Sequence, residues 1–261
     1  MGIKKIKIYI ITYDNYADLH RNLTSLFSCH QNNLKIEVNI INNHSNFLLD
    51  KTFESKVNVL HNTLRPDFSM GHLSRNWNQS LINGFKDLNS PDCDLVIGCQ
   101  DDVEWEINAF KKLKNIHKSY SFYTCSFGDA FWSSTPEAVK KIGIWDERFC
   151  GITFQEADYF VRCLKYNEKN SSINDFAHYR TLNVTESVVN RTTIGFRNHG
   201  SNKYLWSYHK HLFKTKWGDF PEERWGESYN VPDCNITNFV LYPYFEKDID
   251  MSNKNYNTLF F

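Results

Sequence analysis

The sequence predicts an α/β fold in which a mostly parallel sheet is flanked by helices. Short apolar runs rich in β-branched residues alternate with segments whose apolar residues recur at helical spacing. Polar residues stop each apolar run, as is typical of buried strands. With 261 residues, the chain is long enough for one large domain or for one domain with an appendage.

Individual elements follow from these periodicities and from signals at their ends. Buried strands are predicted at residues 6–11, 36–41, 95–97 and, more weakly, 57–60. Helices are predicted at residues 15–27, 73–84, around 110–113, 135–143 and 156–166. In the fourth helix, Thr135 should cap the start, Pro136 takes the first position, and Gly143 should end the helix.

Polar clusters follow the three strong strands. They are Thr12-Tyr13-Asp14, Asn42-Asn43-His44-Ser45 and Gln100-Asp101-Asp102. Ligands of parallel α/β sheets bind outside the carboxyl ends of the strands, so we expect these clusters to converge on one edge. The adjacent carboxylates of Asp101 and Asp102 repel each other, and a cation, a turn or a helix cap could compensate.

The periodic pattern fades after about residue 165. Aromatic residues stand out in the remaining part of the chain: Trp206, Trp217, Trp225, Tyr229, Tyr242, Tyr244 and Phe245. We therefore expect a core domain at residues 1–165 and a C-terminal extension at 166–261. The extension should pack on the core and wall one side of a cleft.

Charge and composition narrow the class of protein. Lys+Arg and Asp+Glu both number 30, which argues against a nucleic-acid binder that relies on neutralising phosphates. The seven cysteines form no C-x-x-C motif and are expected to be free thiols in a reducing compartment. We expect no signal peptide and no transmembrane segment, and hence a cytoplasmic protein; a homo-oligomer is compatible with the sequence.

Several familiar sites are missing from the sequence. There is no G-x-G-x-x-G, no G-x-x-x-x-G-K-[ST] and no H-E-x-x-H or paired Cys/His spacing. A ligand at the sheet edge is therefore not held by a Gly-rich phosphate loop. The acidic strand end favours a diphosphate bound through Mg²⁺ or Mn²⁺, because these cations prefer oxygen ligands and substrate phosphates.

The strand ends and one downstream segment resemble a known family. The strand ends read IYIITYDNY, INNHS and IGCQDDVEW, and residues 128–162 read GDAFWSSTPEAVKKIGIWDERFCGITFQEADYFVR. Over about residues 4–165 this pattern is similar to that of inverting, DxD-type glycosyltransferases of the GT-A fold, family 2 type. The resemblance implies a metal-dependent hexosyl- or pentosyltransferase. Its donor would be a nucleotide-sugar, UDP-sugar first and dTDP- or GDP-sugar next, and its acceptor a glycan or glycoconjugate.

The resemblance also implies roles for individual residues. Donor contacts fall on Thr12, Tyr13, Asp14, Asn43, Arg75, Gln100 and Asp101. Asp102 becomes a ligand of Mn²⁺ or Mg²⁺, and His199 is a candidate contact for the metal or the diphosphate. Gln100 replaces the first acid of the motif and could hydrogen-bond the ribose instead.

The acceptor side of the predicted site lies in residues 128–162. Glu156 takes the position of the catalytic base, after Gln155 in place of an acid, and Asp158 is the alternative base. Asp158 could instead pair with Arg162, four residues along a helix. Asp129 and Trp132 are predicted to bind the acceptor, although core packing is the alternative for Trp132 and for Trp145.

Two other functions stay open. A sugar nucleotidyltransferase shares this fold but would need a Gly-rich basic loop after the first strand, where the chain has Tyr13-Asp14-Asn15-Tyr16. A catalytically silent protein that binds glycans or nucleotides is kept open by Asn42-Asn43 and Gln100, which stand where the family usually has acids.

Overall fold

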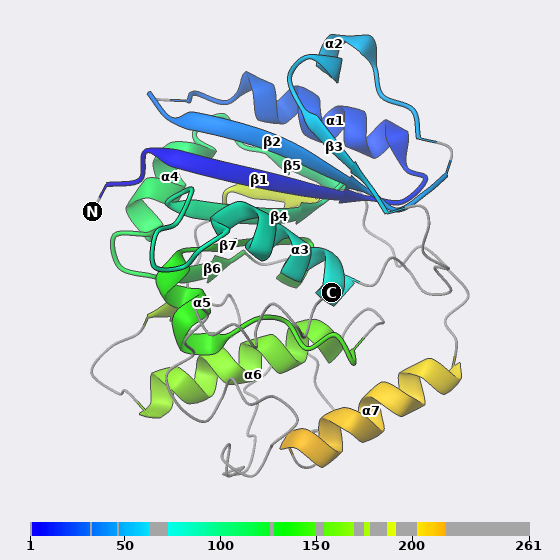
Figure 1. The fold of residues 1–261 in the computed structure, drawn as a ribbon, viewed down its shortest axis with the longest axis vertical. Helices are drawn as coiled ribbons and strands as arrows, with labels where there is room; N and C mark the ends of the chain where they lie inside the picture. The colour runs from blue at the N-terminus through cyan, green and yellow to red at the C-terminus, as the bar shows by residue number, and fades with distance from the viewer. Residues whose placement is uncertain are drawn as a thin grey trace.

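The computed structural model describes nine stretches of the chain and confirms the α/β fold (Figure 1). They are residues 2–31, 33–45, 47–62, 73–125, 128–149, 154–169, 175–177, 187–191 and 203–217. His199 and most of the predicted aromatic extension lie outside them.

The strands belong to two sheets. They are β1 (Lys5–Thr12), β2 (Lys35–Asn42), β3 (Asn58–His61), β4 (Leu95–Gln100), β5 (Val103–Trp105), β6 (Phe122–Thr124), β7 (Phe131–Ser134), β8 (Phe176–Ala177) and β9 (Val189–Arg191). The larger sheet has the order β3-β2-β1-β4-β7-β6-β8, and β5 pairs with β9 in the smaller one. In the larger sheet β7 alone runs antiparallel to its neighbours, β4 and β6.

The structure describes seven α-helices, of which five lie where the sequence predicts them, whereas those at residues 51–54 and 203–217 were not predicted. The helices are α1 (Tyr16–Ser28), α2 (Lys51–Glu54), α3 (Leu73–Phe85), α4 (Ala109–Ile116), α5 (Pro136–Ile142), α6 (Phe154–Lys169) and α7 (Lys203–Trp217), with a 3₁₀ turn η1 at Gly128–Ala130. The ends of α5 are as predicted: Thr135 Oγ1 accepts from the Ala138 N–H, and Gly143 follows at φ 86°. Only glycine adopts that φ without strain, so it stops the helix.

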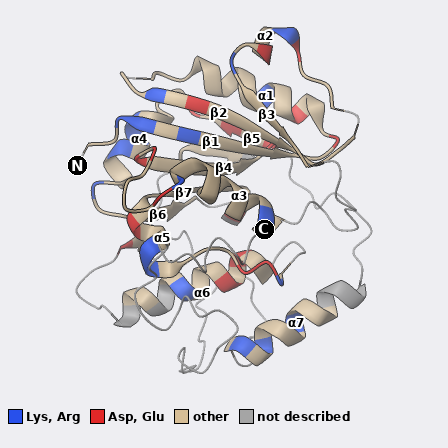
Figure 2. Cartoon of the chain, viewed as in Figure 1, with Lys and Arg blue, Asp and Glu red and all other residues tan. Residues whose placement is uncertain are grey.

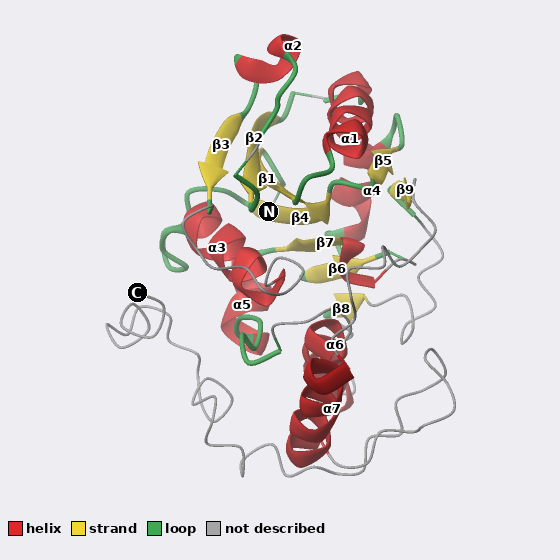
Figure 3. Ribbon diagram, turned by 90° about the vertical axis from the view of Figure 1, so that its right-hand side faces the viewer, coloured by secondary structure: helices red, strands yellow, loops and turns green. Residues whose placement is uncertain are grey.

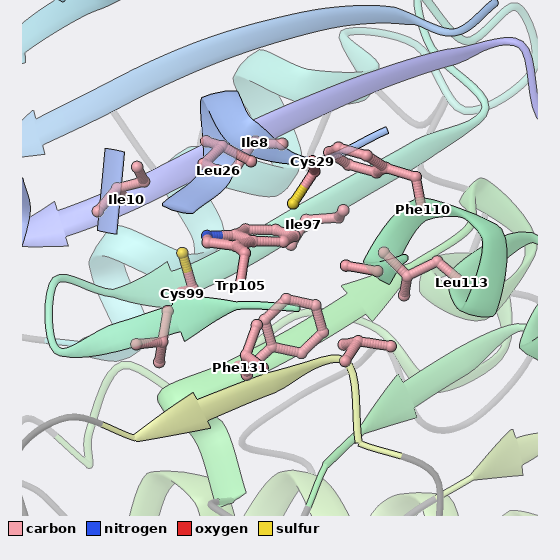
Figure 4. Close-up of a cluster of buried hydrophobic side chains, with 14 of the residues drawn as sticks. Ile8, Ile10, Leu26, Cys29, Ile97, Cys99, Trp105, Phe110, Leu113 and Phe131 are labelled. Carbon is pink, nitrogen blue, oxygen red and sulfur yellow. The ribbon is translucent and has the colours of Figure 1, made fainter. Parts of the chain in front are cut away.

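Two apolar layers cover the sheet because successive side chains of a strand point to opposite faces. Ile6, Ile8 and Ile10 of β1 pack with α1 and α4, whereas Tyr9 and Ile11 pack on the other face. That second layer is built from α3, α5 and α6. Figure 4 shows the first layer, where Trp105, Phe110 and Phe131 close around the strand side chains. The sheet is thus buried on both sides, and ligand access is left to its edges.

Parts of the chain beyond residue 165 belong to the same body. Helix α6 runs across the predicted boundary between 165 and 166. Strand β8 then pairs with β6, and β9 pairs with β5. Helix α7 packs against α6 through Phe213 and Trp217, and both helices lie on the side of the larger sheet away from α1 (Figure 3).

Two further predictions concern the environment of the chain. Cys29, Cys93, Cys99, Cys125 and Cys163 are buried free thiols, as predicted, whereas Cys150 and Cys234 fall outside the described residues. Burial raises the pKa of Cys29 to about 11 and that of Cys93 to about 12, so these thiols are protonated at neutral pH. Across the described ranges, no helix has the length and apolarity that a membrane span requires.

Candidate functional site

The polar strand ends converge as predicted. Thr12 pairs with Asn42 across β1 and β2, and Ile11 pairs with Gln100 across β1 and β4. The Asn43 N–H donates to the Thr12 carbonyl at 3.1 Å, which continues the ladder past the last strand residues. The three clusters therefore share one edge of the sheet, because the strands that carry them are parallel neighbours.

Asp101 is hydrogen-bonded to residues at and just after the end of β1. Its carboxylate is 6% exposed and accepts hydrogen bonds from Thr12 Oγ1 at 2.8 Å and Asn15 Nδ2 at 3.0 Å. The same Asn15 amide also donates to Asp18 at 2.7 Å. Asp101 does not cap the following helix, because Asn108 holds the N-cap position of α4. Neutral donors from the end of β1 thus stabilise one of the two adjacent acids.

Asp102 lies in the turn between β4 and β5 and is 5% exposed. Within the ranges that the structure covers, no group of three or more His, Cys, Asp or Glu side chains is placed to hold a metal ion. Mg²⁺ typically takes one or two carboxylates and completes its shell with substrate phosphates and water. The adjacent carboxylates of Asp101 and Asp102 fit such a shared site, but not a site made by protein side chains alone.

Tyr13 and His44 form an aromatic pair beside the strand ends. Tyr13 is 37% exposed, and its ring meets that of His44 edge to face at 5.1 Å. Asp14 has φ 48°, in the left-handed region, and its carboxylate lies 3.7 Å from His44 Nδ1. The backbone turn at Asp14 leaves Tyr13 accessible to a planar ligand, so its predicted contact with a nucleobase stays a prediction that the geometry permits.

A group of amide side chains extends the site beyond β2. Asn62 Nδ2 donates to Asn43 at 3.4 Å, to Asn76 at 3.2 Å and to Gln79 at 2.8 Å. Asn42 holds the neighbouring turn by accepting from the His44 N–H and donating to the His44 carbonyl. These neutral amides surround Asn43, for which a contact with the donor stays a prediction.

A hydrogen-bonded chain joins the strand ends to the predicted base. Gln100 Nε2 donates to Asp129 Oδ1 at 3.4 Å, and the Asp129 N–H donates to Glu156 Oε2 at 3.4 Å. Glu156 is half-buried in the first turn of α6. Gln100, two residues before Asp102, is thus linked to Glu156 through one intervening residue. The predicted base therefore lies on the same side of the domain as the predicted donor site.

Asp158 has a different environment from Glu156. Its side chain is fully buried and pairs with Arg162 at 3.0 Å and with Lys216 at 2.6 Å. Trp217 Nε1 also donates to it at 2.8 Å. The predicted pairing with Arg162 is confirmed, and these contacts account for Asp158 without a catalytic role. Glu156 is the better candidate for the base.

Other predicted residues have structural partners. Arg75 donates to Glu147 at 3.1 Å, and its predicted contact with the nucleotide stays a prediction. Trp132 and Trp145 are fully buried, with ring centroids 5.9 Å apart. A buried ring cannot stack on a sugar, so core packing, the alternative prediction, accounts for both tryptophans. The predicted His199 contact falls outside the described residues.

Three residues of the site were missed by the sequence reasoning. Asn15 was expected only as a helix cap, Trp77 as part of an apolar helix face, and Gln155 as a substitution in a motif. Trp77 Nε1 and Gln155 Nε2 both donate to Asp129 Oδ2 at 3.1 Å. No local signal could have shown this, because the three residues come from different elements.

Two surface cavities lie elsewhere, one of about 460 Å³ beside α1 and β5 and one of about 400 Å³ between α1 and α2. The first is lined by His20, Arg21 and Glu104, and the second by Leu19, Leu48 and Phe53 among others. Neither is lined by a residue of the strand-end site. We place the candidate site by its hydrogen-bonded side chains rather than by cavity volume.

Comparisons with known proteins support the fold. No family model matches the sequence, and no curated protein matches it. Among solved structures, S. aureus TarS is similar, with a TM-score of 0.51 and 9% identity over 84% of this chain and 40% of that one. TarS residues 1–349 in complex with UDP give a TM-score of 0.51 and 10% identity over 81% of this chain and 64% of that one.

A third solved structure is the mannosyltransferase PcManGT from Pyrobaculum calidifontis, in complex with GDP-Man and Mn²⁺. It matches with a TM-score of 0.49 and 11% identity over 81% of this chain and 63% of that one. The present chain spans less than two thirds of the length of each of these structures. The chain shares the α/β fold of TarS, with a mostly parallel sheet between helices.

Proposed function

We propose that the chain is a metal-dependent, inverting glycosyltransferase that moves a sugar from a nucleotide-sugar to a hydroxyl of a glycan or glycoconjugate. The observation that carries this proposal is the connected site: polar ends of β1, β2 and β4 meet at one edge, and Gln100 and Asp129 link that edge to Glu156. UDP is the first nucleotide to test, since a structure with this fold holds UDP.

Each residue has a physical task in the proposed reaction. Asp102 would hold the cation that neutralises the charge of the leaving nucleoside diphosphate, and Asp101 is fixed beside it by Thr12 and Asn15. Tyr13 and the amides of Asn43 and Gln100 bind the nucleoside. These groups hold the donor at the strand ends.

Glu156 accepts the proton of the acceptor hydroxyl as the oxygen attacks the anomeric carbon. A carboxylate that takes a proton in this way contributes about 10² to 10⁴ in rate. Because the hydroxyl attacks from the face opposite the leaving group, a single displacement inverts the anomeric centre. Glu156 is half-buried rather than sealed in the core, so an acceptor can reach it.

The proposal is tested by nucleotide binding and by turnover. Purified protein is titrated calorimetrically with UDP in the presence of Mn²⁺, in parallel with a thermal-shift screen of UDP-, dTDP- and GDP-sugars. We expect binding that requires the metal, and loss of that binding in Asp102→Ala. The matched control is Glu104→Ala, which removes an exposed acid from the next strand and should leave the titration unchanged.

Donor hydrolysis then separates an enzyme from a binding protein. Wild-type protein should release the nucleoside diphosphate slowly from its nucleotide-sugar when Mn²⁺ is present. If no sugar nucleotide raises the melting temperature, or if Asp102→Ala binds UDP and Mn²⁺ like the wild type, the proposed function is wrong.

A further inference from the structure

Asp129 is a buried acid whose hydrogen bonds come from neutral donors on three separate elements. It is 2% exposed on η1, and it accepts from Trp77 of α3 and Gln155 of α6, both at 3.1 Å. Its second oxygen accepts from Gln100, the last residue of β4, at 3.4 Å. The carboxylate is therefore the point at which the sheet edge, α3 and α6 are joined.

Two of these contacts act directly on the first turn of α6. Gln155 Nε2 donates to the Asp129 carboxylate, and the Asp129 N–H donates to Glu156 Oε2 at 3.4 Å. The side chain of Asp129 thus binds Gln155, and its backbone binds the next residue of the helix, Glu156. Gln155 is fully buried, so its amide has little freedom to turn away.

The chemistry of Gln155 fits this arrangement. A carboxylate only accepts hydrogen bonds, so the residue opposite Asp129 must supply an N–H, which Gln155 does. An acid at position 155 would instead place two buried carboxylates about as close as the present 3.1 Å contact. The amide of Gln155 thus supplies the N–H that the Asp129 carboxylate needs.

We propose that Asp129 is a positioning residue that sets the place of Glu156 relative to the donor bound at the end of β4. This inference rests on the proposed function, and it replaces direct acceptor binding as the role of Asp129. The oxygens of Asp129 are engaged by protein donors, whereas Glu156 is only half-buried.

Positioning of this kind matters because proton transfer and attack depend on distances near van der Waals contact. A displacement of about 1 Å at a catalytic group can cost about a hundredfold in rate. Asp129 lies between Gln100 and Glu156, so its loss changes the spacing between donor and base. It does not remove either group.

The experiment compares substitutions at position 129 under steady-state conditions. Asp129→Leu removes the carboxylate that accepts all three hydrogen bonds and should lower kcat by about ten- to a hundredfold, with the KM for the donor changed by less than about twofold. Asp129→Asn keeps an oxygen that accepts from Trp77 and Gln155. The Gln100 amide can rotate so that its carbonyl oxygen accepts from the new Asn N–H. The kcat of Asp129→Asn should stay within about threefold of the wild-type kcat. If the negative charge of Asp129 were required, this variant would lose activity as Asp129→Leu does.

The matched control is Asn167→Leu at the other end of α6. Asn167 is 6% exposed and bonds the Phe176 carbonyl at 3.1 Å and the Asp175 N–H at 3.2 Å. Its loss also removes buried hydrogen bonds from this helix, but far from Glu156 in sequence. Asn167→Leu should lower the melting temperature and leave kcat within about twofold.

Hydrogen exchange gives a readout that does not depend on activity. Amides in residues 154–162 should exchange faster in Asp129→Leu than in the wild type, Asp129→Asn or Asn167→Leu. If Asp129→Leu fails to fold, Gln155→Leu removes the same contact from the other side. It should show the same faster exchange and the same loss of kcat.

The outcomes separate the two proposals. A rise in the KM for the acceptor with unchanged kcat in Asp129→Leu would assign Asp129 to acceptor binding and overturn the inference. Equal exchange in Asp129→Leu and wild type would also overturn it. If the wild-type protein transfers no sugar while exchange changes as expected, the proposed function fails, and the link between Asp129 and the first turn of α6 stands.

Discussion

Lys216 offers a sharp test of how α7 is held on the domain. Its Nζ lies 2.9 Å from Asp146 Oδ2 and 2.6 Å from Asp158 Oδ1, and its side chain is only 4% exposed. The two acids are 1% and 0% exposed. Figure 2 shows acidic positions on α6 and basic positions on α7, the helices that carry Asp158 and Lys216. Lys216→Met keeps most of the apolar stem and removes the charge between two buried carboxylates.

Two arguments give the size of the effect. Removing one partner of a buried ion pair typically costs about 3–5 kcal/mol, because the other charge is left buried. Burial acts to raise the pKa of Asp146, but the hydrogen bonds and charges of Arg148 and Lys216 outweigh it and hold the pKa at about 2, below the ordinary 3.8. That difference is equivalent to about 2 kcal/mol, of which Lys216 supplies a part. Adding the loss at Asp158, we expect Lys216→Met to lower the free energy of unfolding by about 3 kcal/mol at pH 7.

The pH dependence of this loss has a defined sign. Because the pKa of Asp146 is lower in the folded state, its ion pairs stabilise the fold above about pH 4, and that stability is lost as the pH falls toward 2. The deficit of Lys216→Met should therefore be largest at neutral pH and smaller at pH 3. A deficit that stays the same from pH 7 to pH 3, or grows, would contradict an ion pair between Lys216 and an ionised Asp146.

Urea denaturation followed by tryptophan fluorescence at pH 7 and pH 3 measures these differences. The control is Lys214→Met, an exposed lysine in the same turn of α7, which should change stability by less than about 0.5 kcal/mol. If the two variants lose the same small amount at pH 7, Lys216 is not buried between the two acids, and the account of α7 is wrong.

Three further outcomes are expected. Glu156→Gln should keep nucleotide affinity in calorimetry and lower kcat by about a hundredfold or more; near-normal turnover would exclude it as the base. Gly98→Ala should cost about 1–3 kcal/mol or more in urea denaturation, because a Cβ there would lie 2.3 Å from the Trp132 ring; a loss below that range would show that the ring yields easily. Gln155→Glu should destabilise the protein at pH 7 and less at pH 4, since one of two facing carboxyls must take up a proton beside Asp129; a pH-independent loss would contradict this.

Local patterns were sufficient for the first three strands, for β4 and for five helices, whereas β5 to β9, α2 and α7 were not predicted. The β-branched runs predicted β1, β2 and β4, and Thr135 with Gly143 marked the ends of α5, because each signal lies within one element. The meeting of the polar strand ends was also predictable, since parallel neighbours must end at the same edge. Even the Asp158–Arg162 pair was accessible, because a spacing of four residues makes neighbours on a helix.

Local sequence patterns therefore determine the strands β1, β2 and β4 and the acids that follow β4. Tertiary packing was needed to establish that Trp77 donates to Asp129, 52 residues away, and that Lys216 lies against Asp146, 70 residues away. The cause is that buried polar groups must find partners wherever packing brings a donor or acceptor within reach. That choice depends on three-dimensional contacts, which no spacing along the chain encodes.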